Sequence, residues 1–225
     1  MKVFLATLGK YFHWHQEDTL TAQDIAYAEQ VSQWPLVAFL ITAMCCLGSS
    51  ATCHLCYVKD KNISDWVSIF DYWGIAVLFL GSCYPFIAYK YACGPFIVWR
   101  YIFTSIISVL VVACMYATMT PMSSKRRAGL FSLFAASCTI PTGGLVMWYD
   151  EKYSMPPNLM PFIYPIICYA IGMTIFLKRI PECWNSTGKY DFIGNSHNWW
   201  HMWVNLGILI TCIDNFNLYR ERLEF

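Results

Sequence analysis

The sequence predicts an all-α integral membrane protein built from six membrane-spanning helices. Of its 225 residues, 57% are hydrophobic and only 13% are charged, against about 25% charged residues in an ordinary soluble domain. The apolar residues form long unbroken runs, and a helix needs about 20 such residues to cross a bilayer. The 15 Tyr, 15 Phe and 10 Trp are typical of aromatic belts at membrane interfaces. A formal net charge of +1 gives no indication of a nucleic-acid partner.

The first 33 residues are mostly polar, and we predict that they contain no membrane crossing. Their apolar stretch Val3–Leu8 is far too short to span a bilayer. Six predicted spans follow, at about Trp34–Tyr57, Ser68–Tyr89, Phe96–Thr118, Ala128–Tyr149, Leu159–Leu177 and Asn195–Ile213. The chain is therefore divided into a polar N-terminal segment (1–33), a transmembrane bundle (34–215) and a C-terminal tail (216–225).

An even number of spans puts both ends of the bundle on one side of the membrane. The loops after the first, third and fifth spans carry Lys59, Lys61, Lys125, Arg126, Arg127, Lys178, Arg179 and Lys189. The opposite side carries Lys2, Lys10, Lys90, Lys152, Arg220 and Arg222. Because Lys and Arg favour the inner side, this small excess places those three loops inside. The mitochondrial inner membrane and an endomembrane both remain open as locations.

Two histidines, His197 and His201, stand four residues apart at the start of the sixth span. On a helix, residues i and i+4 lie on one face. Both imidazoles can therefore reach one metal ion, as the histidine pair of zinc-protease helices does. Taken alone, the pair fits equally well with two packed or interfacial histidines.

Ionisable side chains inside membrane spans are costly and therefore indicate function. His54 lies near the end of the first span and Asp71 near the start of the second. Both positions are on the same side of the membrane as the histidine pair of the sixth span. Three imidazoles with one open position are typical of a catalytic zinc site, whereas Mg²⁺ and Ca²⁺ prefer oxygen ligands. We therefore predict that His54, His197 and His201 bind zinc.

Two further residues are candidates for catalysis. Asp71 is predicted to hold the attacking water and act as general base, because the zinc-protease glutamate is replaced by Asn198. Direct ligation of the metal, or a structural role at the start of its helix, are the alternatives for Asp71. Ser50 lies one turn before His54 and can hydrogen-bond a metal ligand or a substrate oxygen. Its alternative is a hydrogen bond to the backbone of its own helix.

Four linked motifs resemble those of the progestin and adipoQ receptor (PAQR) family, which includes adiponectin receptors and hemolysin III proteins. They are Ser50-Ala-Thr-Cys-His54, Phe70-Asp71-Tyr72-Trp73-Gly74-Ile75, Arg179-Ile180-Pro181-Glu182 with Gly188-Lys189-Tyr190-Asp191, and Ser196-His197 with His201. Their order and spacing resemble the family's over about residues 36–215.

The resemblance implies a seven-helix bundle that holds zinc near the cytoplasmic side, with the three histidines as ligands and Asp71 beside the water. It also implies hydrolysis of a lipid amide such as ceramide, although many members are known mainly as receptors. Residues 1–33 offer no counterpart to the family's first helix. The six spans are therefore expected to correspond to helices two to seven of the PAQR bundle.

Two classes of function follow from these observations. The first is a PAQR-like membrane protein with a three-histidine zinc site, acting as a zinc-dependent lipid amide hydrolase or as a receptor. The second is a non-catalytic accessory subunit of a large membrane complex, for example a respiratory complex of mitochondria. Membrane lipids are the expected partners, with a lipid substrate in the first case. A neighbouring subunit is expected to cover the flank that the missing helix leaves open.

Overall fold

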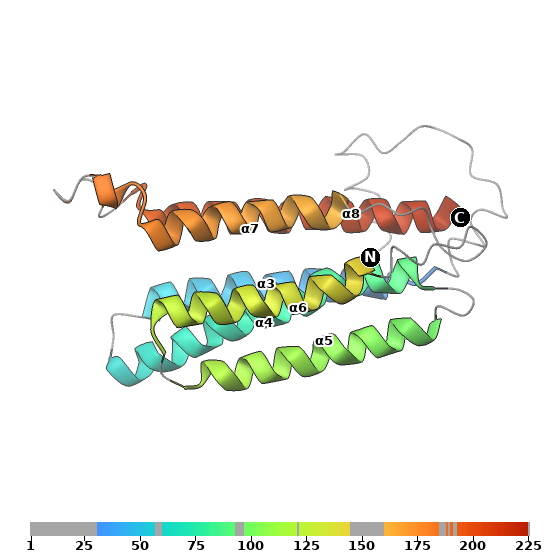
Figure 1. The fold of residues 1–225 in the computed structure, drawn as a ribbon, viewed down its shortest axis with the longest axis horizontal. Coiled ribbons are helices and arrows are strands. Elements are labelled where there is room, and N and C mark those ends of the chain that lie inside the picture. The colour runs from blue at the N-terminus through green and yellow to red at the C-terminus, as the bar shows by residue number, and fades with distance from the viewer. Residues whose placement is uncertain are drawn as a thin grey trace. The chain divides into compact units, whose positions relative to one another are not determined.

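The computed structural model describes residues 31–56, 60–92, 97–120, 122–144, 160–184, 188, 190 and 193–224. Within these residues every regular element is helical (Figure 1). The long helices are α3 (Trp34–Cys56), α4 (Lys61–Lys90), α5 (Ile97–Thr118), α6 (Ser124–Gly144), α7 (Met160–Lys178) and α8 (Ser196–Glu224). A short 3-10 helix, η3 (Glu182–Trp184), lies between the last two. The predicted all-α architecture with six long helices is confirmed.

Four segments of the described chain are long and apolar enough to cross a membrane. They are α3, α4, α5 and Ile163–Trp184, which contains most of α7. By contrast, α6 begins with a Ser-Lys-Arg-Arg run, and α8 carries amide and charged side chains along its length. These polar residues lower the average hydropathy of the two helices without shortening them. With its long apolar helices, the chain is an integral membrane protein.

The bounds of the predicted spans match those of the helices best where the whole helix is apolar. The starts of α3, α5 and α7 fall within one residue of the prediction, whereas α4 begins at Lys61, well before the predicted Ser68. A helix of 30 residues is about 45 Å long, while the hydrocarbon core of a bilayer is about 30 Å thick. The predicted span therefore covers the more apolar part of α4 and leaves out its polar first turns, so that the helix begins before the predicted span does.

The end of α8 was also predicted too early, because this helix runs on from Ile213 to Glu224. Burial of Phe216 and Leu218 gives these last turns an apolar face to pack. The Gln33 side-chain amide donates a 3.2 Å hydrogen bond to the Tyr219 hydroxyl. The start of α3 and the end of α8 therefore lie at the same end of the bundle, with His54 at the other end of α3. Apart from its last three residues, the predicted segment 1–33 lies outside the described residues.

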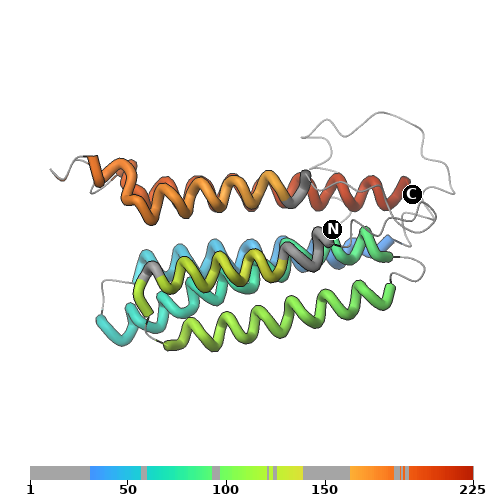
Figure 2. Tube along the Cα trace, viewed as in Figure 1, coloured from blue at the N-terminus to red at the C-terminus, as the bar shows by residue number. Residues whose placement is uncertain are grey.

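Helix α4 occupies the centre of the packing, because it contacts α3, α5, α6 and α8. One core combines Ile87 of α4, Ile107 of α5 and Cys138 of α6, all fully buried. A second core joins α3, α4 and α8 through Phe39, Leu78 and Ile208. Helix α7 packs along α8 (Figure 2). This second core holds α3 beside α8, and these are the two helices that carry the predicted histidine ligands.

Glycines allow the closest helix contacts. A Cβ atom at Gly81 of α4 would lie 1.7 Å from Thr42 Oγ1 and 2.7 Å from Thr42 Cβ. In the other helix pair, a Cβ atom at Gly207 of α8 would lie 2.6 Å from the Tyr169 ring of α7. Real Cβ atoms do not approach other heavy atoms this closely. These two glycines therefore set the spacing of α3 against α4 and of α7 against α8.

Substituting Gly81→Ala is expected to destabilise the bundle by about 1–3 kcal/mol, the usual cost of overpacking a well-packed core. Thr42 cannot simply rotate away without losing its hydrogen bond to the Phe39 carbonyl. The same change at Gly129 of α6 is the matched control, because a Cβ atom there meets nothing within 4 Å. Thermal unfolding in one detergent should lower the midpoint for Gly81→Ala and leave that of Gly129→Ala unchanged or raised. Equal midpoints for the two variants would contradict the packing described.

Candidate metal centre

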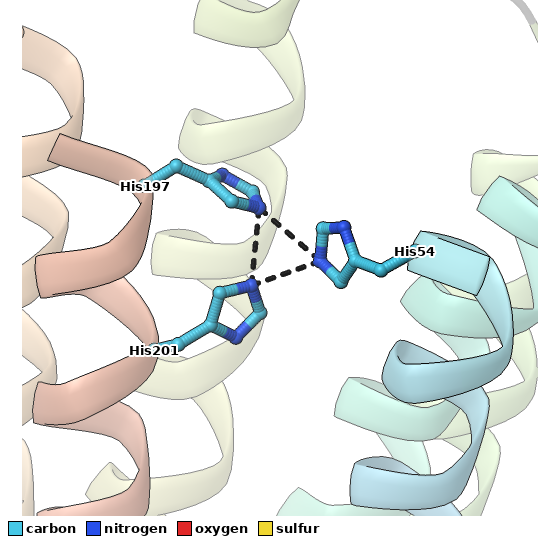
Figure 3. A group of neighbouring side chains, drawn as sticks. All are labelled: His54, His197 and His201. Carbon is cyan, nitrogen blue, oxygen red and sulfur yellow. Dashed lines mark hydrogen bonds between the residues drawn. The ribbon is translucent and has the colours of Figure 1, made fainter. Parts of the chain in front are cut away.

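Three histidine side chains converge between α3 and α8. His54 lies in the last turn of α3, while His197 and His201 lie in the first two turns of α8. Figure 3 shows the three rings pointing at one another, with their Nε2 atoms at the centre. The Nε2 atom of His54 lies 3.0 Å from that of His201 and 3.3 Å from that of His197. The remaining pair, His197 and His201, is separated by 3.0 Å.

Hydrogen bonding alone cannot satisfy this arrangement. A neutral imidazole nitrogen either carries a proton or offers one lone pair, so three identical nitrogens facing each other always leave two protons or two lone pairs opposed. The rings are also steeply inclined to one another, at 73–81° between planes. They therefore meet edge to edge instead of stacking. Three lone pairs directed at one point are the arrangement expected of ligands to a shared cation.

The spacing of the nitrogens fits a zinc ion. Tetrahedral zinc with Zn–N bonds of about 2.1 Å holds neighbouring nitrogens about 3.4 Å apart. The observed separations of 3.0–3.3 Å are close to this value. These three side chains form the group of potential metal ligands among the described residues. Three imidazoles also leave one tetrahedral position for a water molecule or a substrate atom.

Asp71 lies on α4 beside the histidine cluster, half-buried. Its carboxylate is close enough to the Ser50 hydroxyl and to His54 and His197 to interact with them electrostatically. Asp71 nevertheless does not belong to the group of potential ligands. The structure thus brings all five predicted site residues together, with the carboxylate outside the ligand set. Ser50 lies near the carboxylate, a neighbour that neither predicted role of this serine included.

The first turn of α8 is fixed by side chains that the sequence-based prediction of the site did not include. Asn195 is the N-cap, because its Oδ1 accepts a 2.8 Å hydrogen bond from the backbone N–H of Asn198. Glu182 of η3 lies across this helix end. Its Oε1 accepts hydrogen bonds from the backbone N–H of Ser196 at 2.9 Å and from the Ser196 hydroxyl at 2.8 Å. A carboxylate at a helix N-terminus also interacts favourably with the helix dipole.

The turn after α7 places Glu182 in that position. The backbone N–H of Arg179 donates to the Phe176 carbonyl and that of Ile180 to the Ile175 carbonyl. Together with a positive φ of 51° at Arg179, these bonds form a Schellman motif, which ends a helix with a left-handed residue. Proline follows at position 181, where it cannot continue the helix. The Arg-Ile-Pro-Glu motif is thus a helix stop followed by the side chain that anchors the next helix.

Aromatic residues of α7 and α8 support the histidines on one side. The Phe176 ring lies 5.6 Å from the His197 ring and 6.3 Å from the Trp200 ring, measured between centroids. Trp200 and Trp203 in turn pack against Gly172 of α7. His54 is exposed in the described part of the chain, whereas His197 and His201 are partly buried. Aromatic rings therefore pack against the cluster on the α8 side, whereas the cluster is exposed near His54.

The fold and this cluster define a class: an all-helical membrane protein with three convergent histidines held between two of its helices. The chain belongs to the family described as haemolysin-III related, whose sequence model it matches over residues 3–212. This confirms the resemblance drawn from the four motifs. The matched region begins at residue 3 and so takes in nearly all of the segment 1–33, in which the motifs offered no counterpart to the family's first helix.

Curated relatives support the same membership. The chain is 31% identical over 206 residues to heptahelical transmembrane protein 3 of Arabidopsis thaliana, covering 88% of this chain and 57% of that protein. It is 33% identical over 183 residues to heptahelical transmembrane protein ADIPOR3 of Oryza sativa subsp. japonica, covering 79% and 44%. The adiponectin receptor protein of Drosophila melanogaster is 29% identical over 177 residues, covering 74% and 38%. The chain spans about half the length of the curated relatives it matches.

Proposed function

We propose that this chain is a zinc-binding membrane protein and that His54, His197 and His201 are the zinc ligands. One observation carries the proposal: the three Nε2 atoms lie within 3.0–3.3 Å of one another. Imidazole nitrogen is a preferred zinc ligand, whereas the harder cations Mg²⁺ and Ca²⁺ favour oxygen. The two helices that supply the ligands are held together by a shared core, which supports a preformed site.

The reaction that these residues fit best is hydrolysis of a lipid amide of the ceramide type. When bound, zinc would polarise the amide carbonyl and lower the pKa of a coordinated water to about 7. Asp71 would take a proton from the attacking water and pass it to the leaving nitrogen, so that the C–N bond breaks and a fatty acid and an amine form. Ser50, whose hydroxyl lies near the Asp71 carboxylate, would orient it by donating a hydrogen bond. Long apolar helices around the cluster suit a substrate that arrives from the lipid.

A receptor function is the second candidate. Its support is the name of one relative, the adiponectin receptor protein of Drosophila melanogaster. In this case the zinc ion and its three histidines would hold α3 against α8. The arrangement of these two helices would then respond to a bound ligand. The hydrolase and the receptor would share the zinc site, but only the hydrolase would turn over a lipid amide.

Metal content and turnover of the purified protein test the proposal. We expect about one zinc per chain by elemental analysis, lost on dialysis against a chelator and regained on addition of zinc. We also expect release of free fatty acid from ceramide in detergent micelles, which should disappear with the metal and return with it. Zinc without turnover of any lipid amide would favour the receptor or an accessory role. A wild-type protein that neither contains nor takes up zinc would refute the metal site.

A further inference from the structure

We infer that Glu182 is a positioning residue for the histidine cluster: it holds the first turn of α8 so that His197 and His201 face His54. The inference rests on the proposed zinc site and assigns it a residue outside the ligands and the predicted catalytic pair. The contacts described for Glu182 lead to Ser196 and Arg179 and not to the three histidines. It acts through Ser196, the immediate neighbour of His197 in the chain.

Both the backbone N–H and the hydroxyl of Ser196 are hydrogen-bonded at the start of α8. The first four backbone N–H groups of a helix have no partner inside it. Glu182 Oε1 accepts from one of them, that of Ser196, and also from the Ser196 hydroxyl. Ser196 is only 5% exposed, so water has little access to replace these bonds. A charged acceptor makes shorter and stronger hydrogen bonds than a neutral one, and both bonds converge on one oxygen.

The position of the bonds explains why they matter for the site. His197 and His201 lie in the first two turns of α8, where helices fray most easily. Metal ligands must be held within about 0.5 Å of their productive geometry. Further along α8, Trp200 and Trp203 pack against Gly172 of α7 and Gly207 packs against Tyr169, but these contacts begin only at Trp200, three residues after His197. At the head of the helix, the described contacts that hold the backbone are the Asn195 cap and the Glu182 carboxylate.

The turn that carries Glu182 directly follows α7, so the carboxylate also couples two helices. Its backbone leaves α7 through the left-handed Arg179, and the Cys183 N–H donates a 2.7 Å hydrogen bond to the Arg179 carbonyl. Arg179 also interacts electrostatically with the Glu182 carboxylate. Glu182 is thereby held at the end of α7 and aimed at the start of α8.

Three variants separate this role from a general effect on folding. Glu182→Ala removes both accepted hydrogen bonds, Glu182→Gln keeps a carbonyl oxygen that can accept them, and Ser196→Ala removes only the hydroxyl bond. Glu224→Ala is the matched control, because this exposed acid in the last turn of α8 pairs only with Arg220 in the described structure. Zinc affinity would be measured by competition with a chelating indicator. The absorption spectrum of the cobalt-substituted protein would report the geometry of the ligands.

We expect Glu182→Ala to weaken zinc binding by about 10–100-fold, the loss usual for residues that orient metal ligands, and to alter the cobalt spectrum. Glu182→Gln should recover most of the affinity, Ser196→Ala should fall between the two, and Glu224→Ala should match the wild type. Wild-type affinity and spectrum in a folded Glu182→Ala protein would overturn the inference. So would a Glu182→Gln protein as weak as Glu182→Ala.

A second measurement keeps the inference testable if the wild type binds no metal and the zinc proposal fails. Amide hydrogen exchange in the metal-free protein reports the opening of the first turn of α8 directly. Exchange at Ser196–Asn198 should be faster in Glu182→Ala than in the wild type and slow again in Glu182→Gln. Identical exchange in all three proteins would show that Glu182 does not hold this turn.

Discussion

Replacing His201 by alanine is expected to abolish zinc binding at physiological concentrations of the metal. The Nε2 atom of His201 lies 3.0 Å from both of the other ring nitrogens, so it is central to the cluster. Removing it leaves two ligands on different helices. Changes to residues that only orient a ligand cost about 10–100-fold in affinity, and loss of a ligand itself should cost more than about 100-fold.

The control for this experiment is on the same helix. Asn205 lies one turn beyond His201 and is exposed, so Asn205→Ala should retain the zinc content of the wild type. His54→Ala, on α3, should lose zinc as completely as His201→Ala although the two residues are 147 positions apart. Elemental analysis of the four proteins, purified in parallel, checks the prediction. Zinc retained at full stoichiometry in either histidine variant would mean that the metal lies elsewhere.

The histidine cluster could be predicted because two simple rules converge on it. The i, i+4 spacing of His197 and His201 puts both rings on one face of a helix. Alternation of the spans across the bilayer then puts the end of α3 at the same depth as the start of α8. Depth alone does not bring His54 next to α8, however. That proximity depends on the shared core of Phe39, Leu78 and Ile208, and no local pattern in the sequence specifies it.

The contacts that hold the start of α8 could not be predicted from the sequence in the same way. Asn195 has the residue type of an N-cap, but Glu182 lies 14 residues from Ser196, and its contact depends on the turn at Arg179. A left-handed residue at a helix end is usually glycine, so an arginine there gives no signal. The start of α4 and the end of α8 were missed for a related reason, because polar helical turns carry no hydropathy signal. The sequence therefore predicts the helices and ligands, while the contacts that orient them require the structure.

Substituting Asp71→Asn is expected to leave zinc in place while reducing turnover of ceramide by about 10²–10⁴-fold, the usual contribution of a general base. The three imidazoles are untouched, and Asp71 lies outside the group of potential ligands. Asparagine has nearly the same shape and can still accept a hydrogen bond, but it cannot take up a proton. The variant thus separates the metal site from the chemistry.

Asp65→Asn is the matched control, since Asp65 is an exposed carboxylate nearer the start of the same helix and should change neither zinc content nor turnover. Zinc content and single-turnover rates would be measured on the same preparations, so that an effect on chemistry is not confused with one on product release. If Asp71→Asn loses the metal, the carboxylate is a ligand or an essential support of one, and the assignment of Asp71 as base is wrong. If it keeps both metal and turnover, another group must accept the proton. The carboxylate beside the cluster, close enough to His54 and His197 to interact with their charge, would then serve to neutralise the charge of the bound metal.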